Sequence, residues 1–164
     1  MDDVAIVVRP IHESDQAWLA RATVEGWGSD RVVSRGRVTE NLSRLPGFVA
    51  ERDGKPAGFA LVRLEGDELE VVAIRSLRER EGVGTALLGA VQAEAKRVGC
   101  RRVWLVTTND NLDAIRFYQR RGWEWVAFHV DAVTESRRLK PELPQIGAYG
   151  IEIRHELDFE APKT

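Results

Sequence analysis

Two short stretches of this 164-residue chain combine residue types that bind and activate small molecules. The first is Arg78-Glu79-Arg80-Glu81-Gly82-Val83-Gly84-Thr85, which opens an amphipathic helix. Backbone N–H groups in the first turn of a helix have no partner within the helix, so they and the helix dipole attract a phosphate. Glycines let the backbone approach the anion, and Arg78 or Arg80 would add a charged hydrogen bond. The stretch therefore predicts a phosphate site.

This glycine turn has two other interpretations. It can be a plain strand-to-helix turn in which the glycines serve geometry alone. It can also belong to a nucleotide-binding regulatory domain, but it lacks the Gly-Lys-Ser/Thr ending of a P-loop. Leu87 stands where the dinucleotide fingerprint requires Gly or Ala. Both nucleotide motifs therefore match the stretch poorly.

The second stretch, residues 109–123, carries an amide and a phenol on one helix. Asn111 stands where a strand meets this helix, so its side chain can cap the helix or bind a ligand. Ala114, Phe117 and Tyr118 are spaced to share a face. A tyrosine with its ordinary pKa of about 10 is neutral at pH 7 and can donate a proton. Taken alone, Asn111 is more often a cap and the aromatic pair more often core, and we assign Phe117 to the core.

Strands and helices alternate around these stretches. Apolar, β-branched runs predict strands, and a 3.6-residue apolar period followed by Gly99 predicts a helix over residues 82–98. We expect strands at residues 4–9, 48–52, 58–63, 68–74, 102–107, 123–130 and 151–159. Further helices are expected after Ser14 or Asp15 and at residues 111–121. We expect a loop over residues 27–37 and a long connection over residues 133–150.

The two stretches together resemble the GCN5-related N-acetyltransferase (GNAT) superfamily. Gly82 and Gly84 match the glycines of its motif Gln/Arg-x-x-Gly-x-Gly/Ala, although Glu79 stands at the first position. Residues 111–123 match the motif Asn-x-x-Ala-x-x-Phe-Tyr-x-x-x-Gly-Phe/Trp at every named position. The motifs cover about the middle third of the chain.

The resemblance implies a fold and a reaction. It implies an α/β (α+β) fold in a single domain over residues 1–164, with a mixed central sheet of six to seven strands flanked by about four helices. It further implies an acyl-coenzyme A-dependent N-acetyltransferase, in which an amine attacks the thioester of acetyl-coenzyme A directly in a ternary complex. Tyr118 would be the general acid that protonates the leaving thiolate.

The resemblance also implies which residues bind acetyl-coenzyme A. The strand before the glycine turn usually carries a bulge in this family, and its exposed backbone would hold the acyl-pantetheine chain. The expected binding residues are Val72, Ala73, Ile74, Arg78, Arg80, Glu81, Gly82, Val83, Gly84, Thr85, Asn111, Ala114, Phe117 and Tyr118.

The base and the acceptor side are less sharply marked. Glu70 is our choice of general base, with Glu68 or a water as alternatives, and both carboxylates can equally be solvated charges at a strand edge. Glu25 and Trp27 are candidates to hold an amine by charge and cation–π contact, although Trp27 can equally be core. Arg31 and Arg35 are candidates for an acidic acceptor group, or simply solvated charges.

Composition restricts the remaining possibilities. The net charge of −2 gives no field that favours nucleic acid or an anionic membrane. Cys100 is the one cysteine and the three histidines lie far apart, so we expect neither a disulfide nor a metal site. The first residues lack the features of a signal peptide and no apolar run is long enough for a membrane span, so we expect a cytoplasmic protein. The acceptor would be a small-molecule or peptide amine, and the five tryptophans are compatible with a homodimer.

One alternative function stays open. A non-catalytic acyl-coenzyme A sensor or partner-binding module would use the same fold, because fold does not decide function. Asn111 and Tyr118 favour an enzyme, whereas Glu79 and the uncertain base leave the sensor open.

Overall fold

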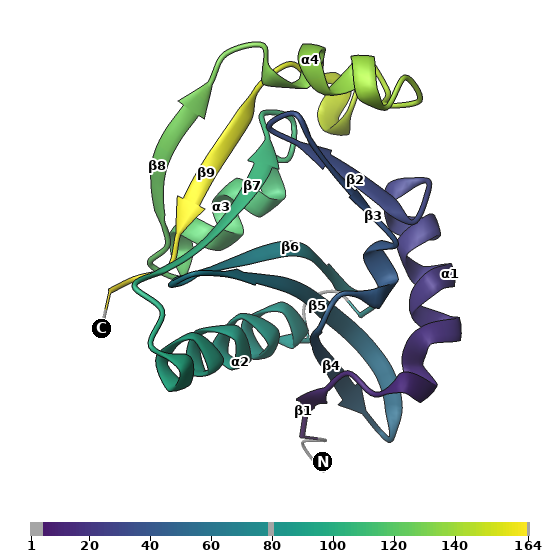
Figure 1. Ribbon diagram of the computed structural model, residues 1–164, viewed down its shortest axis with the longest axis vertical. Coiled ribbons are helices and arrows are strands. Elements are labelled where there is room, and N and C mark those ends of the chain that lie inside the picture. The colour runs from purple at the N-terminus through teal and green to yellow at the C-terminus, as the bar shows by residue number, and fades with distance from the viewer. Residues whose placement is uncertain (1–4, 79–80, 164) are drawn as a thin grey trace. The chain divides into compact units, whose positions relative to one another are not determined.

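A computed structural model describes residues 5–78 and 81–163, which form two compact units (Figure 1). The first unit holds the residues up to Asp30 together with residues 41–103. The second unit holds Arg31–Glu40 together with the residues from Trp104 onward. Glu79 and Arg80, two of the residues discussed above, lie outside the described residues.

The first unit is built on four antiparallel strands. They are β1 (Val7–Pro10), β4 (Gly47–Arg52), β5 (Lys55–Glu65) and β6 (Glu68–Ser76), and they pair in the order β1-β4-β5-β6. Asp53 and Gly54 make the turn between β4 and β5 with φ angles of 54° and 71°, as a two-residue hairpin turn requires.

Helices α1 (Gln16–Trp27) and α2 (Val83–Val98) lie on opposite faces of these strands (Figure 1). Neighbouring residues of β5 point to opposite faces. Gly58 meets Val83 at the start of α2, whereas the buried ring of Phe59 meets Trp18 and Trp27 of α1 at centroid distances of 6.0 and 6.1 Å. Two short 3-10 helices, Glu13–Asp15 and Leu42–Arg44, flank α1 and β4.

The second unit is built on three antiparallel strands. They are β7 (Arg102–Thr108), β9 (Glu156–Glu160) and β8 (Glu124–His129), with β9 in the middle. The first two residues of β7 belong to the first unit. Helices α3 (Leu112–Arg120) and α4 (Ala132–Leu139), a 3-10 turn at Ala148–Gly150, and a hairpin of β2 (Arg31–Ser34) and β3 (Arg37–Glu40) complete the unit.

The prediction of a loop over residues 27–37 was wrong. Trp27 ends α1, and residues 31–34 form β2. The pairs Val32–Thr39 and Val33–Val38 make the hairpin ladder, because β-branched side chains suit paired strands.

The C-terminal segment also differs from its prediction. Residues 132–139 form helix α4, within what was expected to be a connection, and the last strand begins at Glu156 rather than at residue 151. The intervening residues bond locally, since Gly147 N–H donates to Ile151 and Ile153 N–H donates to Gln145, both at 2.8 Å. This local ladder keeps Ile151 and Ile153 out of the three-stranded arrangement.

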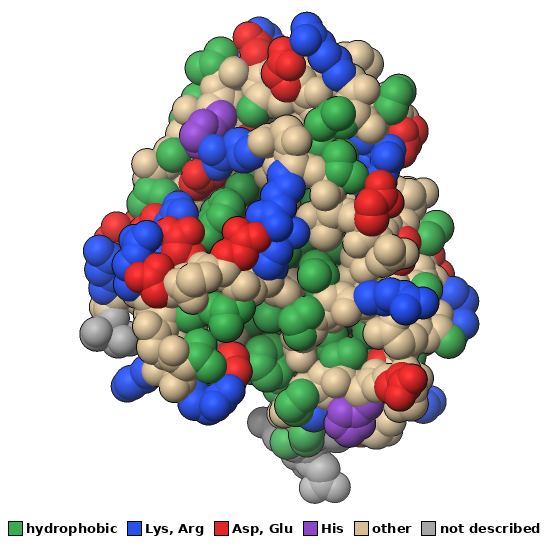
Figure 2. All heavy atoms as spheres, viewed as in Figure 1, with side chains coloured by type: hydrophobic (Ala, Val, Ile, Leu, Met, Phe, Trp, Pro, Cys, Tyr) green, Lys and Arg blue, Asp and Glu red, His purple; other side chains and the backbone are tan. Residues whose placement is uncertain are grey.

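The element count agrees with the sequence. Besides the β2–β3 hairpin, the described residues form seven strands, four in one unit and three in the other, and these with four α-helices match the expected mixed α/β class. No helix among the described residues combines the length and the apolar character that crossing a membrane would need. Basic and acidic side chains are interspersed on the face drawn in Figure 2.

Candidate active site

The glycine turn leads directly into α2. Gly82 caps the helix in the left-handed region, with φ of 83°, and Val83 is the first helical residue. The bond from Ala86 N–H to the Gly82 carbonyl, at 3.0 Å, closes the first turn. Gly84 and Thr85 lie within that turn, which contains no acidic residue. The leading end of α2 therefore presents backbone N–H groups and positive dipole potential, as an anion site requires.

Close packing fixes where this helix starts. A Cβ on Gly58 would lie 2.6 Å from Cγ1 of Val83 and 2.7 Å from the Arg75 carbonyl oxygen, so only glycine fits between β5 and α2. Leu87 packs beside the same position and is buried. The start of α2 is thus held against β5 by a backbone approach that a side chain would prevent.

Charged side chains beside the turn pair with the β4–β5 hairpin. The Arg78 guanidinium lies 3.9 Å from the Asp53 carboxylate, and Glu81 lies 3.4 Å from Arg52. The Arg78 carbonyl accepts a hydrogen bond from the Ser76 hydroxyl at 2.8 Å. These contacts tie the segment before α2 to its own unit.

Strand β6 carries a bulge where the resemblance led us to expect one. Ala73 pairs with Leu61 and Val71 pairs with Val62, so Val72 is an extra residue without a partner on β5. A bulge interrupts the ladder and leaves backbone groups available for other partners. Ile74 follows on the half-buried side of the strand.

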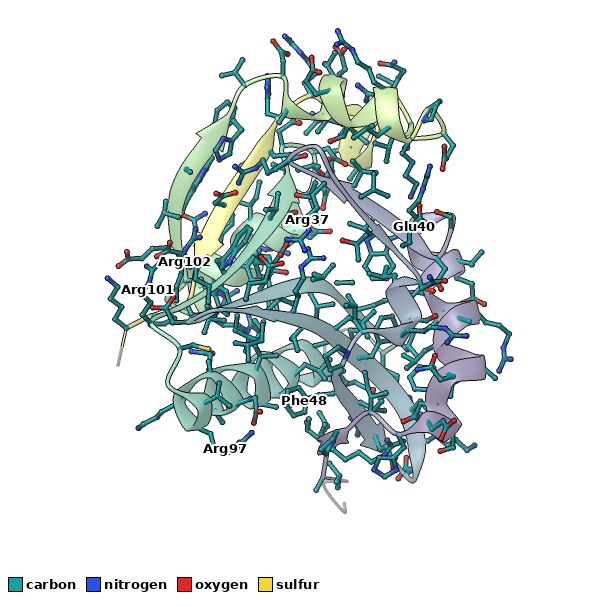
Figure 3. The ribbon with its side chains drawn as sticks, viewed as in Figure 1. Arg37, Glu40, Phe48, Arg97, Arg101 and Arg102 are labelled. Atoms are coloured by element: carbon teal, nitrogen blue, oxygen red, sulfur yellow. The ribbon has the colours of Figure 1, made fainter. Side chains whose placement is uncertain are left out.

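Both candidate bases are ion-paired. Glu70 lies opposite Arg63 on β5, with 3.0 Å between the carboxylate and the guanidinium, and its side chain is 12% exposed. Glu68 lies 2.9 Å from Arg101 and 3.5 Å from Arg102, which Figure 3 labels near the start of β7. Each carboxylate therefore has a guanidinium partner within the first unit.

The end of α1 lies beside the end of β6. Arg75, the residue after Ile74, donates to the Ala22 carbonyl at 2.7 Å and lies 3.5 Å from the exposed carboxylate of Glu25. The Trp27 ring is half-buried against Phe59. Of the two proposed amine contacts, Glu25 is thus near the bulged strand and exposed, whereas Trp27 takes part in packing.

Tyr118 lies in the core of the second unit. Its side chain is 6% exposed, and its ring lies 5.4 to 5.8 Å from the rings of Phe117, Trp123 and Phe159. Burial raises the pKa of the phenol to about 12, so the group is neutral at physiological pH. The hydroxyl has no hydrogen-bond partner among the described residues.

The residues around Tyr118 have local partners. Asn111 caps α3, since its side-chain oxygen accepts from Ala114 N–H at 3.3 Å and its Nδ2 donates to Thr107 at 3.2 Å. Phe117, which we assigned to the core, is only half-buried, and the Arg121 guanidinium carbon lies 3.5 Å from the centre of its ring. Within the chain, Asn111 therefore acts as the N-terminal cap of α3.

The two arginines proposed for the acceptor bind carboxylates of their own unit. Arg31 lies 3.3 Å from Glu142 and donates to the Leu139 carbonyl at 3.2 Å. Arg35 contacts both Glu156 and Asp158 on β9. Of these two acids, Glu156 was a candidate from the sequence because it follows the long connection, whereas Asp158 was missed. Their spacing of two residues within an apolar strand marks a shared, buried face.

The described residues contain no group of three or more His, Cys, Asp or Glu side chains placed to hold a metal ion. Cys100 is half-buried, and burial is the main reason why the pKa of its thiol is raised. A raised pKa disfavours the thiolate form that a nucleophile needs.

Comparison with known proteins matches the chain to one family. Residues 16–123 match the family model described as Acetyltransferase (GNAT) family. The uncharacterized protein YdhI of Bacillus subtilis (strain 168) is 36% identical over 155 residues, which are 94% of this chain and 96% of YdhI.

Two solved structures share the fold. A Bacillus subtilis acetyltransferase in complex with CoA has a TM-score of 0.68 at 17% identity, covering 98% of this chain and 99% of its own. A GNAT family acetyltransferase from Elizabethkingia anophelis with acetyl-CoA bound has a TM-score of 0.64 at 16% identity, covering 94% and 96%. The predicted fold class is thereby confirmed.

Proposed function

The chain belongs to the acetyltransferase (GNAT) family, and from that premise we propose that it moves the acetyl group of acetyl-coenzyme A to a primary amine. The observation that carries the proposal is the leading end of α2, where Gly82 caps a helix without acids in its first turn. Such an end binds phosphate through its N–H groups and dipole. We assign the pyrophosphate of acetyl-coenzyme A to residues 81–85, with Arg78 and Arg80 as flanking cations.

The proposed reaction is a direct transfer. The amine nitrogen forms a bond to the thioester carbon, the carbon–sulfur bond breaks, and the sulfur receives a proton from Tyr118. Backbone groups at Val72, Ala73 and Ile74 hold the acyl chain in this proposal, because the bulge at Val72 interrupts the ladder with β5 at this point. Glu70 takes the proton of the attacking ammonium, directly or through a water, with Glu68 or water alone as the alternatives.

The acceptor is a small-molecule or peptide amine in this proposal. Glu25 attracts its charge at the end of α1, where the carboxylate is exposed. Trp27, Arg31 and Arg35 remain proposed contacts of the acceptor side, although the partners of both arginines within the chain argue for a structural use of their charge. A cytoplasmic location and a homodimer stay predictions of the sequence.

One observation favours a second function. Both candidate bases are engaged by guanidinium groups, and a sensor that binds acyl-coenzyme A without turnover needs no base. The intact Asn111 and Tyr118 pattern favours the enzyme.

Two measurements, made one after the other, test the proposal. Thermal unfolding with acetyl-coenzyme A, ATP or NAD tests the ligand, because a ligand at 100 times its Kd stabilises the folded state by about 2.7 kcal/mol. We expect stabilisation by acetyl-coenzyme A alone, and an equal response to ATP would favour the nucleotide-binding alternative. Thiol release is then followed with lysine, spermidine, tyramine and a tetrapeptide as acceptors. Stabilisation without amine-dependent thiol release would favour the sensor.

A further inference from the structure

The leading end of α2 has a carboxylate directly beside it. Glu81 precedes Gly82, which caps the helix and has no side chain with which to bond the first N–H groups. Carboxylates are drawn to this end of a helix, because its N–H groups lack partners within the helix and its dipole attracts negative charge. Glu81 is therefore placed to occupy the site that the proposed function gives to the pyrophosphate of acetyl-coenzyme A.

Arg52 holds the Glu81 side chain on the β4–β5 hairpin instead. The Arg52 guanidinium, at the end of β4, lies 3.4 Å from the Glu81 carboxylate, and the two side chains are 24% and 34% exposed. Arg78 and Asp53 make a second ion pair between the same two segments, at 3.9 Å. Among the contacts of the described residues, the partner of Glu81 is thus the hairpin and not the start of α2.

Stability alone is a poor reason for the Arg52–Glu81 pair. Partly exposed ion pairs contribute little, since solvent screens them and two long side chains lose freedom. Arg52 also stands directly opposite Lys55 in the register of the hairpin, and like charges in this arrangement repel each other. A cation at position 52 therefore weakens the hairpin tip, and its contact with Glu81 offsets that repulsion. The arrangement points to control of the Glu81 carboxylate.

We propose that Arg52 is a positioning residue for the acyl donor: it draws the Glu81 carboxylate away from the leading end of α2 and leaves the N–H groups of Val83 and Gly84 to the pyrophosphate. This inference rests on the proposed function, which assigns the pyrophosphate to residues 81–85. Arg52 acts through Glu81 rather than by touching the ligand. Without Arg52, the carboxylate turns to the helix end, where it bonds the N–H groups itself and repels the incoming phosphates.

A double-mutant cycle separates this role from a direct contact between Arg52 and a phosphate. Arg52→Gln and Glu81→Gln are made singly and together, because glutamine removes each charge and keeps a polar side chain. Lys55→Gln is the matched control. Lys55 is exposed at the same hairpin tip and forms no ion pair within the described part of the chain, so its loss removes a positive charge without touching Glu81.

Calorimetric titration with acetyl-coenzyme A measures the cycle. The Kd should rise about fivefold in Arg52→Gln, which is the scale on which one charge interacts with a helix end. Glu81→Gln should bind as tightly as the wild type or up to about threefold more tightly, and adding Arg52→Gln to it should change the Kd by less than about twofold. Lys55→Gln should also stay within about twofold of the wild type. The loss in Arg52→Gln should shrink as the salt concentration rises, because ions screen exposed charges.

Hydrogen exchange of the unliganded protein gives a readout that a merely structural role would not produce. In Arg52→Gln the amides of Val83 and Gly84 should exchange at least about threefold more slowly than in the wild type, because Glu81 then caps them. Adding Glu81→Gln should abolish this protection. A general loss of stability would accelerate exchange at these amides instead.

Three results would overturn the inference. An equal loss of affinity on Arg52→Gln, with and without Glu81→Gln, would mean that Arg52 binds the phosphates directly. An unchanged Kd in Arg52→Gln, or unaltered exchange at the start of α2, would mean that Arg52 does not control Glu81. A wild-type protein that takes up no acetyl-coenzyme A would refute the proposed function together with this inference, whereas wild-type affinity in Arg52→Gln would refute the inference alone.

Discussion

Tyr118 is the residue whose environment bears most directly on the proposed chemistry. Burial raises the pKa of its phenol to about 12, whereas an ordinary thiol has a pKa of about 8.5. A phenol that is the weaker acid gives up its proton to the thiolate only if the proton is replaced. The nitrogen of the tetrahedral intermediate can replace it, because that nitrogen must lose a proton to become the neutral amide. In the proposed reaction, we therefore expect Tyr118 to act as a hydrogen-bond donor whose proton transfer is coupled to that of the amine.

We expect Tyr118→Phe to lower kcat by about 10²- to 10⁴-fold and to leave acetyl-coenzyme A affinity unchanged. Because the pKa is raised, the hydroxyl stays protonated up to about pH 11, and the loss should be uniform from pH 6 to 10. Thiol release measures kcat, and calorimetric titration measures affinity. Unchanged turnover, with chemistry shown to be rate-limiting, would remove Tyr118 from this role.

Glu70 and Glu68 can be separated by amide substitution. Glu70→Gln keeps an oxygen that can accept from Arg63, so its fold should be retained while its basicity is lost. We expect kcat to fall by about 10²-fold or more for Glu70→Gln and to change less than twofold for Glu68→Gln. The reverse order would assign the base to Glu68, and wild-type rates in both variants would favour water.

Among the elements, α2 depends on its close approach to β5. Gly58→Ala would force a Cβ to 2.6 Å from Val83, so we expect the free energy of unfolding to fall by about 1–3 kcal/mol. Gly89→Ala is the matched control, because a Cβ at this position of α2 meets nothing within 4 Å. Alanine there should stabilise the protein by about 0.5–1 kcal/mol. Urea unfolding measures both, and equal effects would contradict the packing argument.

The sequence predicted α2 and α3 well because apolar periodicity and glycine stops define them locally. It failed for β2 and α4, whose short and largely polar sequences are organised by contacts distant in the chain. Lys140 bonds to Arg31 across 109 positions, and Arg35 reaches Glu156 across 121. For the same reason, Asn111 and Tyr118 were identifiable as a motif, whereas the guanidinium partners of Glu70 and Glu68 were not.

At the scale of the molecule, the chain crosses between the two units at residues 30/31, 40/41 and 103/104. Neither unit is a continuous segment, and β7 contributes residues to both. Because the chain passes from one unit to the other three times, unfolding one unit frees segments whose ends are fixed in the other. This connectivity favours one cooperative transition and the prediction of a single domain over residues 1–164.

We expect calorimetry to record one endotherm whose calorimetric and van't Hoff enthalpies agree. Gly58→Ala in the first unit and Gly147→Ala in the second, where a Cβ would lie 2.1 Å from the Asp110 carboxylate, should each lower the same Tm. We expect each variant to destabilise the protein by about 1–3 kcal/mol. In a chain of this size, each kcal/mol lowers the Tm by roughly 2–4 °C. Two transitions, each sensitive to only one of these variants, would mean that the units unfold independently.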